Sequence, residues 1–134
     1  IHGVLVQPMA ADGVEVILGI HRDDTFGPLL MLGLGGIHVE ILGDKVFAPV
    51  PLTEPEASEL IERLKAKALL SGARGTEPAD IDALIDIIVR LSNFAADHAD
   101  RIEEIDLNPV RVHPEGEGGG VSVLDALIIQ RRTP

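Results

Sequence analysis

Short apolar runs and apolar–polar alternation predict short β-strands in the first half of the chain. These strands are expected at residues 3–9, 15–21, 29–32 and 45–52. In the second of them, Val16, Leu18 and Ile20 should face a hydrophobic core, because they share one side of the strand. The prolines of the last strand restrict it to the edge of a sheet.

An apolar repeat of three to four residues predicts two helices in the middle of the chain, at residues 54–70 and 80–98. Thr53 and Glu56 have the spacing of a capping box at the start of the first helix. The second helix should bury one apolar face, made of Ile81, Leu84, Ile85, Ile88, Leu91 and Ala95.

Two more strands are predicted after the helices, at residues 102–113 and 121–130. The glycine-rich segment between them can only be a loop, so the two strands should form an antiparallel hairpin. Strands joined by hairpin turns, with two consecutive helices between them, predict an α+β fold. We expect a mostly antiparallel sheet with both helices on one face.

One face of the predicted strand 102–113 carries the oxygen-bearing side chains of Glu104, Asp106 and Asn108. If the hairpin turns near Glu117, Asn108 lies opposite Asp125 or Ala126. Asn108 and Asp125, with Asp106, then form an oxygen-only cluster that suits a hard cation such as Mg²⁺. The alternative is a solvated hairpin face without a ligand, because most polar strand faces simply meet water.

Composition and charge exclude several classes of partner. The 134-residue chain has 11 basic and 22 acidic residues, a net charge of -11, which argues against nucleic acid or an anionic membrane as partner. Any bound phosphate should therefore come with a metal ion. The chain has no Cys, which excludes disulfides and thiolate metal sites. Because it begins at Ile1 in strand-like sequence, we interpret it as a piece of a longer protein.

Four sequence segments resemble the NDP-forming (ADP-forming) acyl-CoA synthetases, relatives of the succinyl-CoA synthetase β chain. Residues 22–40, R-D-D-T-F-G-P-L-L-M-L-G-L-G-G-I-H-V-E, are similar to the family's R-D-x-x-F-G-P…G-x-G-G-x-x-V-E block. E-I-D-L-N-P at 104–109 and L-D-A at 124–126 resemble the end of the family's ATP-grasp domain, and V-Q-P-M at 6–9 resembles its V-Q-x-M segment. The resemblance implies that residues 1–134 are the C-terminal part of an ATP-grasp domain.

The resemblance also implies a ligand set for a nucleotide and its metal. Asn108 and Asp125 match the residues that bind the Mg²⁺ of ATP or ADP in the family. Asp106 is then a third ligand or an acceptor behind the other two.

The remaining implied contacts are with the nucleotide. Backbone groups near Gln7 and Met9 would hydrogen-bond the adenine edge, and Glu15 would lie near the ribose or the metal. Gly35 and Gly36 would face the reaction centre.

The implied function is that of a nucleotide- and Mg²⁺-binding half-domain of a cytoplasmic ligase that converts acid, CoA and ATP to acyl-CoA, ADP and phosphate. In that family the phosphate passes through a phosphohistidine in another domain, so no catalytic residue is expected in this chain. Its partners would be an adenine nucleotide, the remaining ATP-grasp lobe and the CoA-binding and ligase domains, in the same or a partner chain. The alternative is a non-catalytic regulatory or interaction module in a protein acetyltransferase fusion.

Overall fold

The structure is a computed structural model that describes residues 3–10, 12–35, 43–72, 75, 77–116 and 118–132. Its strands are β1 (Val14–Asp23), β2 (Gly27–Leu34), β3 (Lys45–Pro49), β4 (Ile102–Val112), β5 (Val121–Val123) and β6 (Ala126–Gln130). Its helices are α2 (Glu54–Glu62), the short 3-10 helix η1 (Lys67–Leu69) and α3 (Ile81–Asp97).

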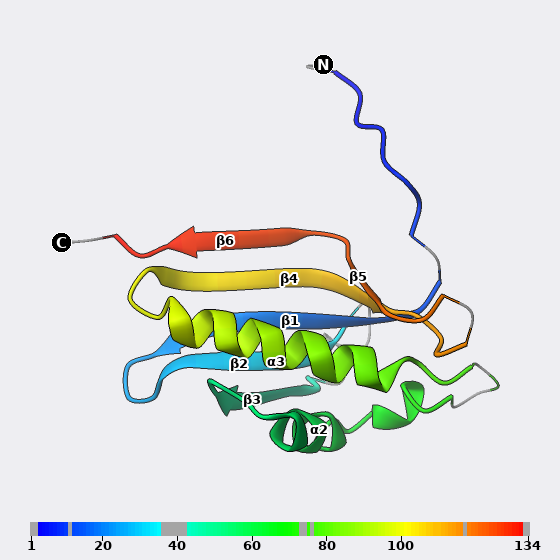
Figure 1. Ribbon diagram of the computed structural model, residues 1–134, viewed down its shortest axis with the longest axis horizontal. Coiled ribbons are helices and arrows are strands. Elements are labelled where there is room, and N and C mark those ends of the chain that lie inside the picture. The colour runs from blue at the N-terminus through cyan, green and yellow to red at the C-terminus, as the bar shows by residue number, and fades with distance from the viewer. Residues whose placement is uncertain are drawn as a thin grey trace.

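The six strands form one antiparallel sheet in the order β3-β2-β1-β4-β5, and β6 also pairs with β4. Helices α2 and α3 lie on the same face of this sheet (Figure 1). The predicted α+β fold with a mostly antiparallel sheet and two helices on one face is therefore confirmed. The predicted edge position of the proline-bearing strand is also confirmed, because β3 ends the sheet. No helix in the described ranges is long and apolar enough to cross a bilayer.

The hydrophobic core lies between the sheet and the helices. Val16, Leu18 and Ile20 of β1 are buried, as the alternation predicted. They meet the apolar face of α3, from which Leu84 and Ile88 are fully buried. Burial of side chains of this size contributes about 1.5–3 kcal/mol each, which makes this layer the main source of stability.

Three elements differ from the sequence prediction: the first helix, the first strand and the last strand. The helix expected at 54–70 ends at Glu62, and the chain continues into η1. Asp44, which is only 2% exposed, accepts hydrogen bonds from the backbone N–H groups of Lys65 and Ala66 at 2.8 and 2.9 Å. Because a carboxylate from another segment satisfies these amides, the helix does not continue through them.

The strand expected at residues 3–9 is absent, and residues 3–10 instead form an extended arm that projects from the body (Figure 1). Val4, Leu5 and Val6 are 87%, 82% and 88% exposed. A strand requires a neighbouring strand to satisfy its backbone groups. Within the described chain the arm has no such neighbour.

The capping box at the start of α2 is confirmed and has a pH-dependent element. Hydrogen bonds from the Thr53 backbone N–H and from its hydroxyl hold the pKa of the Glu56 carboxyl below its usual value of 4.5. A carboxyl whose pKa is lowered by folding stabilises the protein above its unfolded pKa, and this contribution disappears as the pH falls through the folded pKa.

We therefore expect Glu56→Ala to lower the melting temperature at pH 7, and the deficit to shrink as the pH falls below 4.5. Glu59→Ala is the matched control, because Glu59 is an exposed glutamate of the same helix outside the capping box. Thermal melts of both variants from pH 3 to pH 7 test this expectation. A Glu56→Ala deficit that is constant across this range would contradict it.

Candidate functional site

The sheet face opposite the helices carries several of the polar residues singled out in the sequence. In the register between β1 and β4, Glu15 pairs with Arg111 and Gly19 with Asp106. Directly paired residues share one face of a sheet. These pairs alternate with the buried pairs under the helices, so they belong to the other, open face.

Glu15 and Arg111 form an ion pair on this open face. Arg111 Nη2 donates to Glu15 Oε1 at 2.8 Å, and the two side chains are 22% and 35% exposed. The pair is thus shielded more than an ordinary surface ion pair but is still reachable from solvent. A bound anion or metal would meet a carboxylate and a guanidinium that already neutralise each other.

Gly35, at the end of β2, lies against the same glutamate. Its backbone N–H donates to the Glu15 carbonyl oxygen at 2.7 Å. A Cβ at Gly35 would stand 3.0 Å from the Glu15 Cβ, closer than an ordinary contact, so glycine permits this approach. The structure therefore brings together the predicted residues Glu15 and Gly35. Gly36 lies outside the described residues.

The backbones of Asn108 and Asp125 lie opposite each other in the hairpin. The Asn108 backbone N–H donates to the Asp125 carbonyl oxygen at 3.1 Å, so the predicted opposition of these two residues is confirmed at the level of the backbone. The strand expected at 121–130 is broken at this point into β5 and β6. Pro109 lacks an N–H and cannot donate to the ladder, which accounts for the break.

The same position is a bulge in the pairing of β4 with β1. Val110 pairs with Val16 and Leu107 with Leu18, so Asn108 and Pro109 together lie opposite a single residue of β1. Bulges locally redirect side chains and recur beside functional sites. Asn108 lies three residues from Arg111 on β4, about 10 Å along the strand. The predicted metal residues are therefore neighbours of the cluster of Glu15 and Gly35.

The donor set of the hairpin fits a hard cation that shares its coordination with another ligand. Asn108 and Asp125 are exposed, Asp106 is half-buried, and Asp125 Oδ1 accepts from the Ala126 N–H at 2.9 Å. No group of three or more His, Cys, Asp or Glu side chains within the described ranges could hold a metal by itself. Carboxylate and amide oxygens with open positions suit Mg²⁺, which keeps waters or takes phosphate oxygens as its remaining ligands.

Gln7 and Met9 of the arm border an open groove of about 550 Å³. The other side of the groove is the hairpin of β4 and β5, which contributes His113, Ser122, Val123 and Leu124. Leu124 directly precedes Asp125, so the groove runs up to the predicted metal residues. Gln7 and Met9 thus share a groove with the segment that leads to Asp125.

Two residues of this region escaped the sequence prediction. Arg111 contacts Glu15 and also donates from Nη1 to the Ala10 carbonyl at 3.4 Å. His113 is only 8% exposed, and its ring nitrogens lie 2.9 Å from the Asp12 carbonyl and 2.7 Å from Ser122 Oγ. Their partners in β1 and the arm are about a hundred residues away in sequence, so no local motif marks them.

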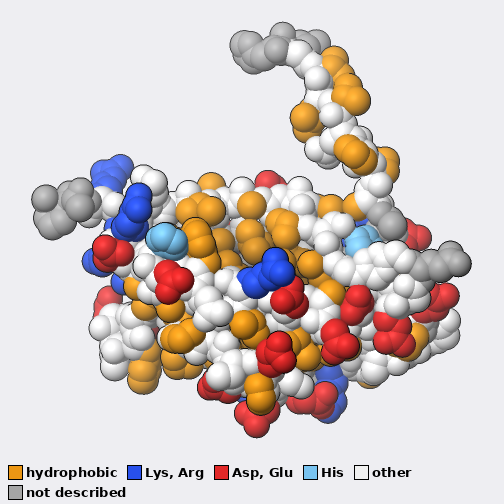
Figure 2. Space-filling view, in the orientation of Figure 1, with side chains coloured by type: hydrophobic (Ala, Val, Ile, Leu, Met, Phe, Trp, Pro, Cys, Tyr) orange, Lys and Arg blue, Asp and Glu red, His pale blue; other side chains and the backbone are white. Residues whose placement is uncertain are grey.

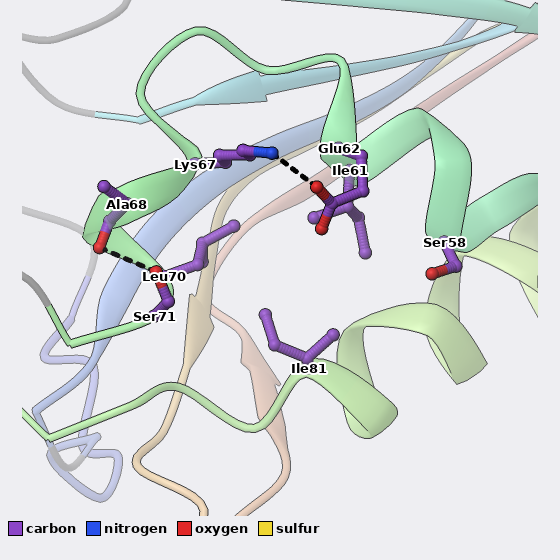
Figure 3. Close-up of a pocket in the computed structure, with 8 residues that line it drawn as sticks. All are labelled: Ser58, Ile61, Glu62, Lys67, Ala68, Leu70, Ser71 and Ile81. Atoms are coloured by element: carbon purple, nitrogen blue, oxygen red, sulfur yellow. Dashed lines mark hydrogen bonds and ion pairs between the residues drawn. The ribbon is translucent and has the colours of Figure 1, made fainter.

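A separate pocket of about 340 Å³ lies in the helical layer, between α2, η1 and α3 (Figure 3). Ile61, Leu70 and Ile81 form its apolar wall. The Lys67 ammonium at its rim is paired with Glu62, and the Ser71 hydroxyl donates to the Ala68 carbonyl at 3.2 Å. The polar groups of this pocket are therefore engaged with each other, as Glu15 and Arg111 are on the open sheet face.

Comparison with known protein families gives one extended match. A profile of the ATP-grasp domain matches residues 1–129. Among curated proteins, the β subunit of ADP-forming acetate–CoA ligase II of Pyrococcus furiosus is 50% identical over 129 residues, which are 96% of this chain and 54% of that protein. ADP-forming acetate–CoA ligase I of Archaeoglobus fulgidus is 47% identical over 116 residues, 87% of this chain and 17% of that protein. The chain therefore spans about half of the first relative and a smaller share of the second.

Solved structures agree with these matches. The PH1788 protein of Pyrococcus horikoshii is similar with a TM-score of 0.87 and 46% identity, over 94% of this chain and 52% of that one. Acetyl-coenzyme A synthetase 1 of Ca. Korarchaeum cryptofilum, solved with coenzyme A and Mg-AMPPCP, is similar with a TM-score of 0.82 and 44% identity, over 91% of this chain and 55% of that one. In that complex a phosphohistidine segment points towards the nucleotide-binding site.

Proposed function

This chain belongs to the ATP-grasp family, and we propose that residues 1–134 are the C-terminal, nucleotide- and Mg²⁺-binding lobe of an ADP-forming acyl-CoA ligase. The whole ligase would interconvert acid, CoA and ATP with acyl-CoA, ADP and phosphate. The phosphate would pass through a histidine of another domain. The other ATP-grasp lobe and the CoA-handling domains would come from the same or a partner chain.

The observation that carries this proposal is the convergence of polar groups on the open sheet face. Glu15, Gly35 and Arg111 meet there, and the bulge at Asn108 lies about 10 Å away along β4. In the helical layer, by contrast, none of the described residues predicted to bind the nucleotide or the metal lines the pocket of Figure 3. The open face is thus the better candidate for a charged ligand.

Different residues of this lobe would bind the Mg²⁺, the adenine and the phosphates of the nucleotide. Asp125 would supply a negative charge and Asn108 a neutral oxygen to the metal, with Asp106 beside them. Bound in this way, Mg²⁺ would neutralise charge on the phosphate oxygens during phosphoryl transfer. Gln7 and Met9 would hold the adenine edge through backbone groups, and Glu15 and Gly35 would border the ribose and phosphates.

The relatives support the nucleotide and the metal as ligands of this lobe. The Korarchaeum protein, 44% identical over most of this chain, is solved with Mg-AMPPCP, a nucleotide analogue with its metal. The same protein is also solved with coenzyme A and Ca-AMPCP. An acidic chain with a net charge of -11 would bind a polyphosphate only together with a cation, which agrees with these complexes.

Isothermal titration of Mg-AMPPCP into the protein that carries both ATP-grasp lobes tests this function. We expect saturable binding that weakens at least tenfold when EDTA removes the Mg²⁺, because the lobe offers few cations of its own for the phosphates. Binding of equal strength without Mg²⁺, or none with it, would overturn the proposal.

A further inference from the structure

The base of the N-terminal arm is fastened to β4 by two side chains. The His113 ring lies with Nδ1 2.9 Å from the Asp12 carbonyl oxygen, and Arg111 Nη1 donates to the Ala10 carbonyl at 3.4 Å. A carbonyl oxygen only accepts, so Nδ1 carries the proton of this hydrogen bond. In the neutral ring Nε2 then accepts from the Ser122 hydroxyl at 2.7 Å. His113, the residue directly after β4, therefore links β5 to Asp12 at the base of the arm.

Gly13 brings the backbone of this base unusually close to β4. A Cβ built on Gly13 would lie 2.4 Å from the Val112 carbonyl oxygen, a distance that no side chain tolerates. The next residue, Val14, pairs directly with Val112 in the sheet. The segment around Asp12 is thus held by the hydrogen bond from His113 and by the pairing of Val14 with Val112. Val4 and Val6, further out on the arm, are 87% and 88% exposed. The arm leaves the body from a fixed base.

This geometry bears on the groove between the arm and the hairpin. Gln7 and Met9 form one wall of the groove, and His113 and Ser122 belong to the other. Asp12 follows Gln7 by only five positions in the chain, so the position of the wall depends on how firmly the base is held. A ligand that contacts both walls would bind more tightly if the base of the arm is already held in position. Binding would then cost less conformational entropy.

We propose that His113 is a positioning residue that anchors the arm through Asp12 and thereby sets the affinity of the groove for the nucleotide. The role rests on the proposed function, since the nucleotide is the ligand taken to lie between the two walls. His113 does not itself need to touch the nucleotide. The competing view is that His113 only stabilises the fold, as buried and hydrogen-bonded histidines commonly do.

Two substitutions of the same residue separate these roles. In His113→Asn the amide nitrogen replaces Nδ1, so the bond to Asp12 can be kept while the one to Ser122 is lost. In His113→Gln the amide nitrogen replaces Nε2, so the bond to Ser122 can be kept while the one to Asp12 is lost. His98→Gln serves as the control, because His98 caps the C-terminal end of α3. That end of the helix lies at the opposite end of the molecule from the arm (Figure 1).

The test is made in the protein that carries both ATP-grasp lobes. We expect His113→Gln to raise the Kd for Mg-AMPPCP about tenfold, the effect of losing one hydrogen bond, and His113→Asn to stay within about twofold of the wild type. Amide hydrogen exchange at Gly13 and Val14 should accelerate in the Gln variant alone. Melting curves for all variants check that each one folds.

Equal Kd values for the two His113 variants, or equal exchange at Gly13 and Val14, would overturn the positioning role. A general loss of stability would affect both variants and would show in their melting curves. A wild type that binds no nucleotide would instead overturn the proposed function. The exchange measurement, which needs no nucleotide, would then still decide whether His113 anchors the arm.

Discussion

Replacing Asp125 with Ala is expected to lower kcat/KM of the whole ligase for Mg-ATP by about 10²- to 10³-fold, the cost of removing one preorganised electrostatic contact in a phosphoryl-transfer site. Asp125 is exposed and its backbone is bonded to that of Asn108, so the side chain is not needed to hold the hairpin together. Within the described residues, its side chain accepts one hydrogen bond, from the neighbouring Ala126 N–H, and this bond is local. The loss should therefore appear in activity and not in stability.

Steady-state kinetics at several Mg²⁺ concentrations measure this effect. The variant should require more Mg²⁺ for half-maximal rate, because the metal would lose a charged ligand. Asp86→Ala is the matched control, since Asp86 lies on the outer side of α3 in an exposed pair with Arg90. Glu103→Ala is a second control, because the ion pairs of Glu103 in the described part of the chain, with Arg22 and Arg131, are loose at 3.8 Å. Activity of Asp125→Ala equal to that of both controls would remove the metal assignment.

Alternation and helical periodicity were sufficient for most of the fold. The buried face of β1 and the start of α2 follow directly from patterns that span a few neighbouring residues. The hairpin of β4 with β5 and β6 also follows, because the loop of glycines leaves the two strands no other short connection. The local sequence was enough to predict an element wherever the residues that stabilise it are close in the chain.

The structure departs from the sequence prediction where a residue distant in the chain determines the local structure. Helix α2 stops at Glu62, and Asp44 bonds the amides of Lys65 and Ala66 from about twenty residues earlier in the chain. The break between β5 and β6 depends on Pro109 in the neighbouring strand. The arm has strand-like sequence but no strand beside it in the described chain. Secondary-structure propensity depends on neighbouring residues, so it does not predict these contacts.

The candidate site, like the fold, was predicted from the sequence only in part. Asn108 and Asp125 were predicted to lie opposite each other, and their backbones do. The direction of their side chains and the binding of a metal stay predictions. Arg111 and His113 were missed because an arginine between valines and a histidine at a strand end carry no spacing signal. Only the sheet register reveals that they reach Glu15 and Asp12.

The isolated 134-residue chain is expected to neither hydrolyse nor synthesise ATP. Phosphoryl transfer depends almost entirely on positioning and on neutralising charge around the phosphates, with groups gathered from the whole site. The chain spans 54% of its Pyrococcus relative, and under the proposed function the phosphate-binding groups of the other lobe lie in the remainder. One wall of the site is then missing.

The exposed apolar surface of the chain is consistent with a missing wall. The arm exposes Val4 and Val6 almost completely, and the edge strand β6 leaves Leu127 and Ile128 more than half exposed. Figure 2 shows apolar side chains uncovered along the arm and beside β6, whereas acidic side chains gather over the helices. Under the proposed function, segments of the other lobe would cover this apolar surface.

Release of ADP, followed with a coupled assay, measures the activity of the isolated chain. The chain carrying Asp125→Asn is made and purified in parallel, so that a contaminating ATPase would appear equally in both samples. We expect the same background rate in the two preparations, while the protein with both lobes turns over ATP in the same assay. Turnover by the wild-type chain that Asp125→Asn abolishes would contradict the prediction. Such a result would mean that this lobe alone positions and neutralises the phosphates, and that the proposed division of the site between two lobes is wrong.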